Sequence, residues 1–389
     1  MTYPAIIGLG MTEMSLRPGG TARELAHQAV SAALADAGLA RSDVDGLLVG
    51  SSQGVRPDRV GVSLARQGGF GDLALLEHVE IKGATAAAMV QRAVLAVRAG
   101  LARTVVCVFA DAPLRAGGGS GSTYARSGGT EGVRGLERAS GVLGSVPTYA
   151  LLASRYLALT GGSEEDLCAV ARTARAWAAG NPHAVARTPL SAEDYFAGRM
   201  VSTPLRLYDC ARPVNGAVAL VVGTPGRDGG APPPVHVRGM AQHHSVRRRR
   251  AGAESWFDQD SSALRATVDR ALAMAGRRRW DVDVLELYDP FTVVTLCLLE
   301  GYGFCEPGHA GKLARSGALG PDGDLPVNTG GGQLAGFYLQ GMTPIAEAVV
   351  QLRGTGGGRQ VPRAATAFVA GIGGRIDHHA FLVLDREPL

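Results

Sequence analysis

The feature that most constrains the fold of this chain is an alternation of short apolar runs with longer amphipathic segments, which occurs twice along the sequence. In the first succession, apolar runs at residues 5–9, 44–49 and 104–110 are separated by the helical patterns 21–37 and 84–98. Short apolar runs are typical of buried strands, and apolar positions three or four residues apart are typical of helices. Strands that alternate with helices favour a layered α/β fold.

A second succession follows a segment rich in glycine and proline at residues 226–234, which is the clearest internal boundary. We therefore predict two similar halves, residues 1–230 and 231–389, with a polar and largely helical loop insertion at about 112–205 in the first half. A chain of 389 residues can bury a large core without disulfides or a metal. In the second half we expect strands at 235–240, 284–288, 366–371 and 380–384, and helices at 262–275, 292–301 and 342–353.

Charge and composition argue against several classes of partner. The net charge is +4 and aromatic residues make up 5% of the chain, whereas nucleic-acid binding favours long basic stripes with interleaved aromatics. The four arginines that begin at Arg247 either meet the phosphates of a nucleotide-bearing ligand or lie in a solvated loop. The first residues lack a signal-peptide pattern, and no run of about 18 apolar residues occurs. We expect a cytoplasmic protein with no membrane span and no nucleic-acid partner.

The cysteines and histidines show no disulfide or metal pattern. The five cysteines are irregularly spaced without a CxxC pair, and the nine histidines form no HExxH motif, so we expect no metal site. In the pairs His243–His244 and His378–His379, adjacent side chains diverge if the segment is a strand. One member of each pair is then packed and the other exposed, although His243 and His244 are also candidates to line a ligand pocket.

Three segments of the second half carry a resemblance to a known family. They read ELYDPFT at 286–292, VNTGGG at 327–332 and AGIGG at 370–374. In order and spacing they resemble thiolases of the sterol-carrier-protein X and bacterial lipid-transfer type. The helix at 84–98 and the NGA sequence at 215–217 extend the resemblance over nearly the whole chain.

The resemblance implies a thiolase fold, an α/β architecture of two pseudo-symmetric, βαβ-rich halves stacked in alternating helix and sheet layers. It also implies a homodimer and an acyl-CoA ligand that reaches a buried pocket between the halves.

The residues that carry thiolase chemistry are replaced in this chain. By this resemblance, the nucleophilic cysteine falls on Gly83 and the second cysteine on Gly371. The activating histidine falls on Tyr338, and the asparagine of the Asn-Glu-Ala-Phe element falls on Tyr288. Since glycine cannot carry an acyl group, a covalent thioester at this position is excluded.

This pattern resembles the steroid side-chain-cleaving aldolases of the lipid-transfer branch. The resemblance implies retro-aldol cleavage of a bulky β-hydroxyacyl-CoA to a ketone and a short acyl-CoA such as propionyl-CoA. Coenzyme A is then part of the substrate, and no separate cofactor is expected. The family also implies a small partner protein that binds acyl-CoA and carries an OB-fold and a zinc ribbon.

Retro-aldol chemistry needs a base for the substrate hydroxyl, a means to stabilise the enolate, and an acid for the α-carbon. Tyr288 and Tyr338 are jointly the candidates for acid and base, and the sequence leaves open which does which. A free tyrosine has a pKa of about 10, so a tyrosine that acts as a base needs help from its surroundings. The two lysines, Lys82 and Lys312, are poor candidates for a Schiff base, because a thioester forms imines reluctantly.

Further candidates surround the two tyrosines. Backbone N–H groups near Gly83 and Gly373 are expected to stabilise the enolate, because glycine lets a ligand approach closely. Asp289 and Gly331 are expected at the ligand site, although Gly331 is also compatible with a simple tight turn. A tyrosine after a strand is often only a core residue. A catalytically silent acyl-CoA-binding, lipid-binding or scaffold subunit therefore stays an alternative, and thiolysis by Cys305 is a third.

Overall fold

The computed structural model describes residues 4–52, 60–118, 123–124, 131–226, 232–245, 261–374 and 376–388. Its main sheet has nine strands. The first half contributes β1 (Ala5–Met11), β2 (Gly46–Gly50), β3 (Leu75–Val79), β4 (Thr104–Asp111) and β7 (Gly216–Gly223). The second half contributes β8 (Val235–His244), β9 (Val284–Leu287), β10 (Thr366–Gly373) and β11 (His378–Asp385).

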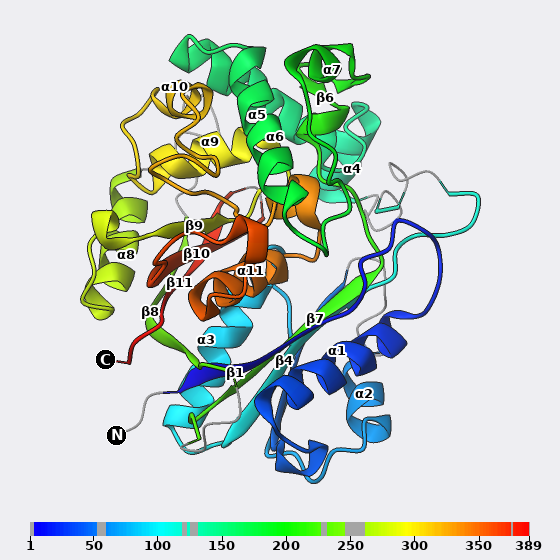
Figure 1. The fold of residues 1–389 in the computed structure, drawn as a ribbon. Coiled ribbons are helices and arrows are strands. Elements are labelled where there is room, and N and C mark those ends of the chain that lie inside the picture. Colours follow the sequence, from blue (N-terminus) through cyan, green and yellow to red (C-terminus); the bar gives the residue numbers. More distant parts are fainter. Residues whose placement is uncertain are drawn as a thin grey trace.

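The strand pairing repeats between the two halves. The sheet order is β3-β2-β4-β7-β1-β8-β11-β10-β9. In the first half, β7 pairs antiparallel with β1 and β4, and β4 pairs parallel with β2. In the second half, β11 pairs antiparallel with β8 and β10, and β10 pairs parallel with β9. The half-sheets meet where Ala5 and Ile6 of β1 pair with β8 (Figure 1). This is the pseudo-symmetric α/β arrangement that the sequence predicts.

Helices cover both faces of the sheet and fill its centre. The helices α1 (Ala22–Ala37) and α2 (Gly61–Gln67) cover the first half, and α8 (Ser261–Met274) covers the second. Between the half-sheets lie α3 (Thr85–Arg98) and α11 (Met342–Arg353), whose buried residues share one core with strands of both halves (Figure 1). Alanines at the start of α3 allow this close central packing.

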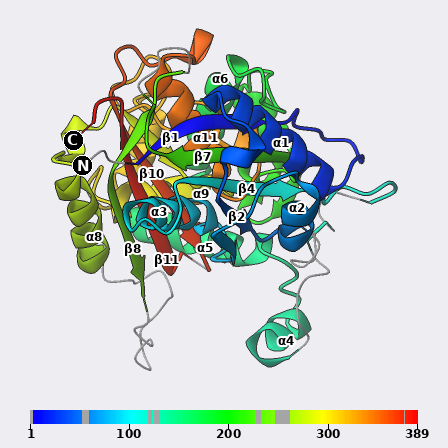
Figure 2. The same ribbon diagram turned by 90° about the horizontal axis from the view of Figure 1, so that it is seen from below.

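A helical insertion separates β4 from β7. It contains α4 (Gly132–Ala139), α5 (Val146–Thr160), α6 (Glu164–Ala179), α7 (Ala192–Ala197), the hairpin β5 (Met200–Ser202) and β6 (Leu205–Arg206), and the turn η5 (Leu207–Asp209). The insertion packs on α9 (Thr292–Gly301) and α10 (Ala310–Arg315) of the second half. Figure 2 shows α4 set apart from the body of the molecule. The insertion therefore covers part of the second half, where the candidate site lies.

Most predicted elements are present with ends shifted by a few residues. The sequence missed α2, α10, the short turns η1 (Arg41–Asp43), η6 (Arg279–Asp281) and η8 (Gly357–Arg359), and a π-helix, η7 (Gly332–Gly336), inside a glycine run. The division near residue 230 stays a prediction, because residues 227–231 lie outside the described part. Among the described residues, no helix combines the length and the apolar character needed to cross a bilayer.

Candidate active site

Tyr288 and Tyr338 meet at the junction of the two halves. Tyr288 directly follows β9, and its backbone N–H donates to the carbonyl of Ala370 on β10 at 2.9 Å. Tyr338 lies two residues after η7. The two hydroxyl oxygens are 3.1 Å apart, and the rings meet edge to face with centroids 6.5 Å apart. The two phenols are therefore placed to exchange a proton directly.

Both phenols are held in the neutral form. Burial raises the pKa of Tyr288 well above the usual value, and the neighbouring Tyr338 raises it further. Burial also raises the pKa of Tyr338, but there the hydrogen bond with Tyr288 offsets part of the rise. Neither phenol is therefore a standing base at neutral pH.

The ring of Tyr288 occupies the space beside Gly83, just before α3. A Cβ atom on Gly83 would lie 2.3 Å from Cζ of Tyr288 and 2.3 Å from the carbonyl oxygen of Ile372. Two other glycines crowd the Gly83 carbonyl: a Cβ on Gly341 would approach it to 2.5 Å, and one on Gly371 to 2.8 Å. Any side chain at position 83, cysteine included, collides with the phenol that stands there.

Asp289 is directed at η7. Its carboxylate accepts a 2.8 Å hydrogen bond from the backbone N–H of Gln333, and burial raises its pKa to about 7. A Cβ on Gly332, at φ +58°, would lie 2.1 Å from the Asp289 carboxylate. Gly331 packs against α6, where a Cβ would lie 2.6 Å from Cβ of Ala178. Asp289 and Gly331 thus shape the turn that leads to Tyr338.

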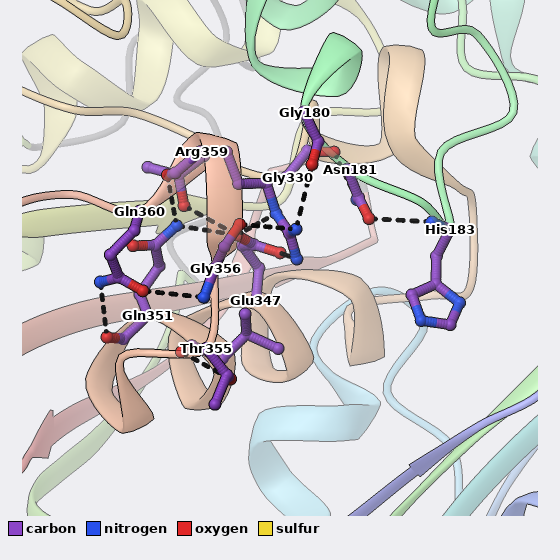
Figure 3. Close-up of polar contacts among 12 residues, drawn as sticks. Gly180, Asn181, His183, Gly330, Glu347, Gln351, Thr355, Gly356, Arg359 and Gln360 are labelled. Carbon is purple, nitrogen blue, oxygen red and sulfur yellow. Dashed lines mark hydrogen bonds and ion pairs between the residues drawn. The ribbon is translucent and has the colours of Figure 1, made fainter.

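A buried polar network contacts Thr329 and Gly330, which precede η7. Figure 3 shows its contacts around Gly330, Glu347 and Arg359. Arg359 and Glu347 form a two-point ion pair, with N–O distances of 2.8 and 3.0 Å. The hydroxyl of Thr329 lies 2.8 Å from Glu286 and 3.2 Å from Glu347, and the amide of Asn181 donates to the Gly330 carbonyl at 2.8 Å. Burial, followed by the charge of Glu347, raises the pKa of Glu286, which is therefore a neutral acid.

The remaining predicted residues lie on β8 and β10 or outside the described residues. Gly373 is on β10, where a Cβ would lie 2.4 Å from the Ile81 carbonyl oxygen, and its expected role in stabilising the enolate stays a prediction. The ring of His243 faces His379 at 6.2 Å. The exposed His244 faces His378 across the strand pair at 5.4 Å. Arg247 lies outside the described residues.

The cysteines offer no activated thiol. All five are free, and burial raises the pKa of each one: Cys107, Cys168, Cys210, Cys297 and Cys305. The pKa of Cys305 rises to about 12, which leaves almost no thiolate at neutral pH. Within the described ranges, no group of three or more histidine, cysteine, aspartate or glutamate side chains could hold a metal ion.

Two functional candidates were missed by sequence reasoning. Asp111, at the end of β4, accepts a hydrogen bond from the hydroxyl of Tyr124, whose ring lies 6.2 Å from that of Tyr338. The sequence signal that could have identified Asp111 is its position at the end of a strongly apolar strand, since ligand sites often form at the carboxyl ends of parallel strands. Asp111 ends a strand that is parallel to β2.

A small surface hollow of about 40 Å³ lies beside η7. Its lining includes Leu334 and Ala335 of η7 together with Arg175 and Arg212. Arg175 is anchored, because it donates to the Thr188 carbonyl at 2.8 Å. Arg212 is exposed. The hollow therefore combines apolar side chains of η7 with two arginines.

Known proteins similar to this chain share its architecture. A family model described as thiolase C-terminal domain-like matches residues 247–386. A 17-hydroxy-3-oxo-4-pregnene-20-carboxyl-CoA lyase of Mycobacterium tuberculosis is 36% identical over 358 residues, covering 90% of this chain and 92% of the relative. A steroid side-chain-cleaving aldolase of Thermomonospora curvata is 35% identical over 359 residues, covering 90% of each protein. A solved structure described as Ltp2-ChsH2(DUF35) aldolase matches with a TM-score of 0.84 and 32% identity, covering 99% of this chain and 98% of that one.

Proposed function

This chain belongs to the steroid side-chain-cleaving aldolases of the thiolase superfamily, and we propose that Tyr288 and Tyr338 carry the proton transfers of its carbon–carbon cleavage. The enzyme is an acyl-CoA lyase that performs a retro-aldol reaction on a bulky, steroid-like β-hydroxyacyl-CoA. The observation that supports the tyrosine assignment is the 3.1 Å contact between two buried hydroxyls at the junction of the halves.

The name of the mycobacterial relative defines the bond that such an enzyme breaks. A 20-carboxyl-CoA with a 17-hydroxyl places the hydroxyl β to the thioester carbonyl. Cleavage of the bond between the α- and β-carbons turns the alcohol carbon into a ketone. The other fragment keeps the α-carbon, its methyl group and the thioester, which together make propionyl-CoA. We propose the same pair of products for this chain.

The phenol pair supports the proton steps of this reaction. The hydroxyl proton must leave as the carbon–carbon bond breaks, and the α-carbon must gain a proton as the enolate collapses. Two neutral phenols in hydrogen-bond contact can donate to the enolate and pass a proton between them. Burial raises the pKa of both phenols, so both keep their protons at neutral pH and the pair is proposed to act jointly.

A thiolase mechanism lacks its nucleophile here. Glycine occupies position 83, and the Tyr288 ring fills the space where a side chain would stand. The free cysteines of the chain keep their protons at neutral pH, because burial raises the pKa of each. Proton transfer without an acyl-enzyme is therefore the chemistry that this site supports.

We propose that the surface beside this hollow binds the phosphates of the coenzyme A part of the substrate. Its arginines, Arg175 and Arg212, have the charge that phosphates require. Leu334 and Ala335, which also line the hollow, lie only four and three residues before Tyr338 in the chain. A second protein appears in the name of the solved aldolase. We propose that this chain also works with a small acyl-CoA-binding protein, and a homodimer and a cytoplasmic location stay predictions.

The test is release of a short acyl-CoA and a ketone from a steroid-like β-hydroxyacyl-CoA, with the partner protein added. We expect Tyr338→Phe to lower kcat by about 100-fold or more, as loss of an acid–base group does. Tyr302→Phe is a matched control, because Tyr302 is also a buried phenol but is hydrogen bonded to His379 at 2.9 Å. That variant is expected to keep its kcat. Binding without product release by the wild type, even with the partner, would establish a silent subunit instead.

A further inference from the structure

A buried carboxylate lies on the first-half side of the phenol pair. Asp111 is only 3% exposed. One of its oxygens accepts a 2.8 Å hydrogen bond from the Tyr124 hydroxyl, and the other accepts a 2.6 Å hydrogen bond from the Ser52 hydroxyl. Burial raises the pKa of Asp111 to about 6, so at neutral pH it is an ionised carboxylate that can still take up a proton.

Tyr124 connects this carboxylate to the phenol pair. Its ring centroid lies 6.2 Å from that of Tyr338, with the planes inclined by 59°. Burial raises the pKa of Tyr124 and of Tyr338, and the charge of Asp111 raises both further. In the described part of the chain, these two tyrosines are the titratable groups that interact with Asp111. A phenol whose proton is held by a carboxylate has a more electron-rich oxygen and is a better proton acceptor.

The reaction needs such an acceptor. Burial keeps both phenols of the pair neutral, so a proton that leaves the substrate hydroxyl cannot rest on either of them. The pair has protons to give to the enolate but has no standing negative charge with which to begin the cleavage. Asp111 is the ionisable carboxylate that the structure places next to this pair.

We propose that Asp111, acting through Tyr124, takes up the proton of the substrate hydroxyl. This inference rests on the retro-aldol function proposed above. The substrate O–H bond breaks as its proton moves to the Tyr124 oxygen, and the original Tyr124 proton moves to the Asp111 carboxylate. The O–H electron pair becomes the ketone π bond, and the electrons of the carbon–carbon bond enter the enolate.

The second half of the cycle restores the site. The phenol pair protonates the α-carbon and is left one proton short. The protonated Asp111 returns its proton through Tyr124, so that no proton is gained or lost over the turnover. Asp111 is thus a positioning residue that acts through Tyr124, and Ser52 fixes the direction of its carboxylate.

The test is the pH profile of kcat/KM for short acyl-CoA release. For the wild type, we expect the rate to fall about tenfold for each pH unit below about 6, where Asp111 becomes protonated. Asp111→Asn keeps the shape and one acceptor oxygen but removes the charge. It is expected to lower the rate by about 100-fold or more and to abolish the acidic limb. Tyr124→Phe should act in the same direction.

Two further variants keep the test decisive. Ser52→Ala removes a hydrogen bond that lowers the pKa of Asp111, so its acidic limb should move to higher pH. Glu300→Gln is the control, because Glu300 also accepts from a buried phenol, Tyr156, at 2.6 Å. It should keep the acidic limb.

A wild-type rate and profile in Asp111→Asn, or an unmoved limb in Ser52→Ala, overturns the inference. If Tyr338→Phe is inactive in the same assay, the proposed function still stands. An inactive wild type would count against that function itself.

Discussion

At the scale of residues, Gly83 and Tyr288 depend on each other. Loss of a side chain at position 83 creates the space that the Tyr288 ring fills, as the 2.3 Å approach to a Cβ atom shows. The Ile372 carbonyl lies equally close. Restoring a cysteine at position 83 would therefore displace the phenol and distort the backbone, and would not recover a working thiolase.

Gly83→Ala should lose lyase activity because its Cβ atom displaces the Tyr288 ring. Overpacking of a tight core costs about 1–3 kcal/mol, so the free energy of unfolding should fall by that amount. Steady-state kinetics and urea unfolding measure both effects. Gly226→Ala is the control, since nothing lies within 4 Å of a Cβ there and its φ is not in the left-handed region. Full activity in Gly83→Ala would show that the Tyr288 ring is not fixed as described.

Asp111→Asn should stabilise the fold at neutral and alkaline pH. The folded pKa of Asp111 is raised from 3.8 to about 6, so its contribution to stability is present below pH 3.8 and is lost as the pH rises through about 6. At pH 8 the ionised carboxylate therefore costs up to about 3 kcal/mol, which the amide avoids. Urea unfolding of both proteins at pH 4 and pH 8 should show a difference that grows with pH. A constant difference contradicts the raised pKa.

At the scale of elements, the π-helix η7 positions Tyr338. Its first residue, Gly332, has φ +58° and lies against the Asp289 carboxylate, which in turn accepts from the Gln333 N–H. Asp289 follows Tyr288 in the chain, so one contact links the segments that carry the two phenols. A change at Gly332 is therefore expected to reach both of them.

Gly332→Ala should lower kcat by about tenfold or more, because its Cβ atom must push Asp289 away from η7 and a small misplacement of catalytic groups is costly. Gly357→Ala is the matched control. It has the same φ of +58° but nothing within 4 Å of a Cβ. Both variants bear the backbone cost of about 1 kcal/mol, and only Gly332→Ala should lose activity. Equal kcat values in the two variants would show that the contact between Gly332 and Asp289 does not position the catalytic groups.

Regular elements were predictable because their apolar residues follow a helical spacing, as in α3, or form one continuous run, as in β4. The π-helix η7 was not, because a glycine run has no apolar period and its shape depends on the tertiary contact with Asp289. The sequence placed Tyr288 and Tyr338 as a pair through the family resemblance. It could not show that Asp111, from the other half of the chain, reaches them through Tyr124. That contact depends on how the halves pack.

At the scale of the whole molecule, the site is assembled from both halves and the insertion. The Glu347–Arg359 pair joins α11 to η8, and Arg359 also reaches the Gly180 carbonyl beside α6 at 3.4 Å. Thr329 connects this pair to Glu286 on β9. The network thus fixes the segment before η7 relative to three separate parts of the chain (Figure 3).

The two glutamates of this network should respond differently to neutralisation. Glu286 is already a neutral acid, since burial raises its pKa, so Glu286→Gln should change the free energy of unfolding little. Glu347→Gln leaves the buried Arg359 without its counter-charge and should cost about 3–5 kcal/mol. Urea unfolding at pH 7 compares the two variants. A larger loss in Glu286→Gln would contradict the assigned protonation states.

The central claim is that the two hydrogen-bonded phenols act as one catalytic unit. The most direct measurement is kcat for short acyl-CoA release by Tyr288→Phe, Tyr338→Phe and the double variant, each shown to be folded. We predict a loss of about 100-fold or more in each single variant. The double variant should be no slower than the slower single one, because residues that act as a unit are non-additive. A folded single variant with the wild-type kcat would contradict the account.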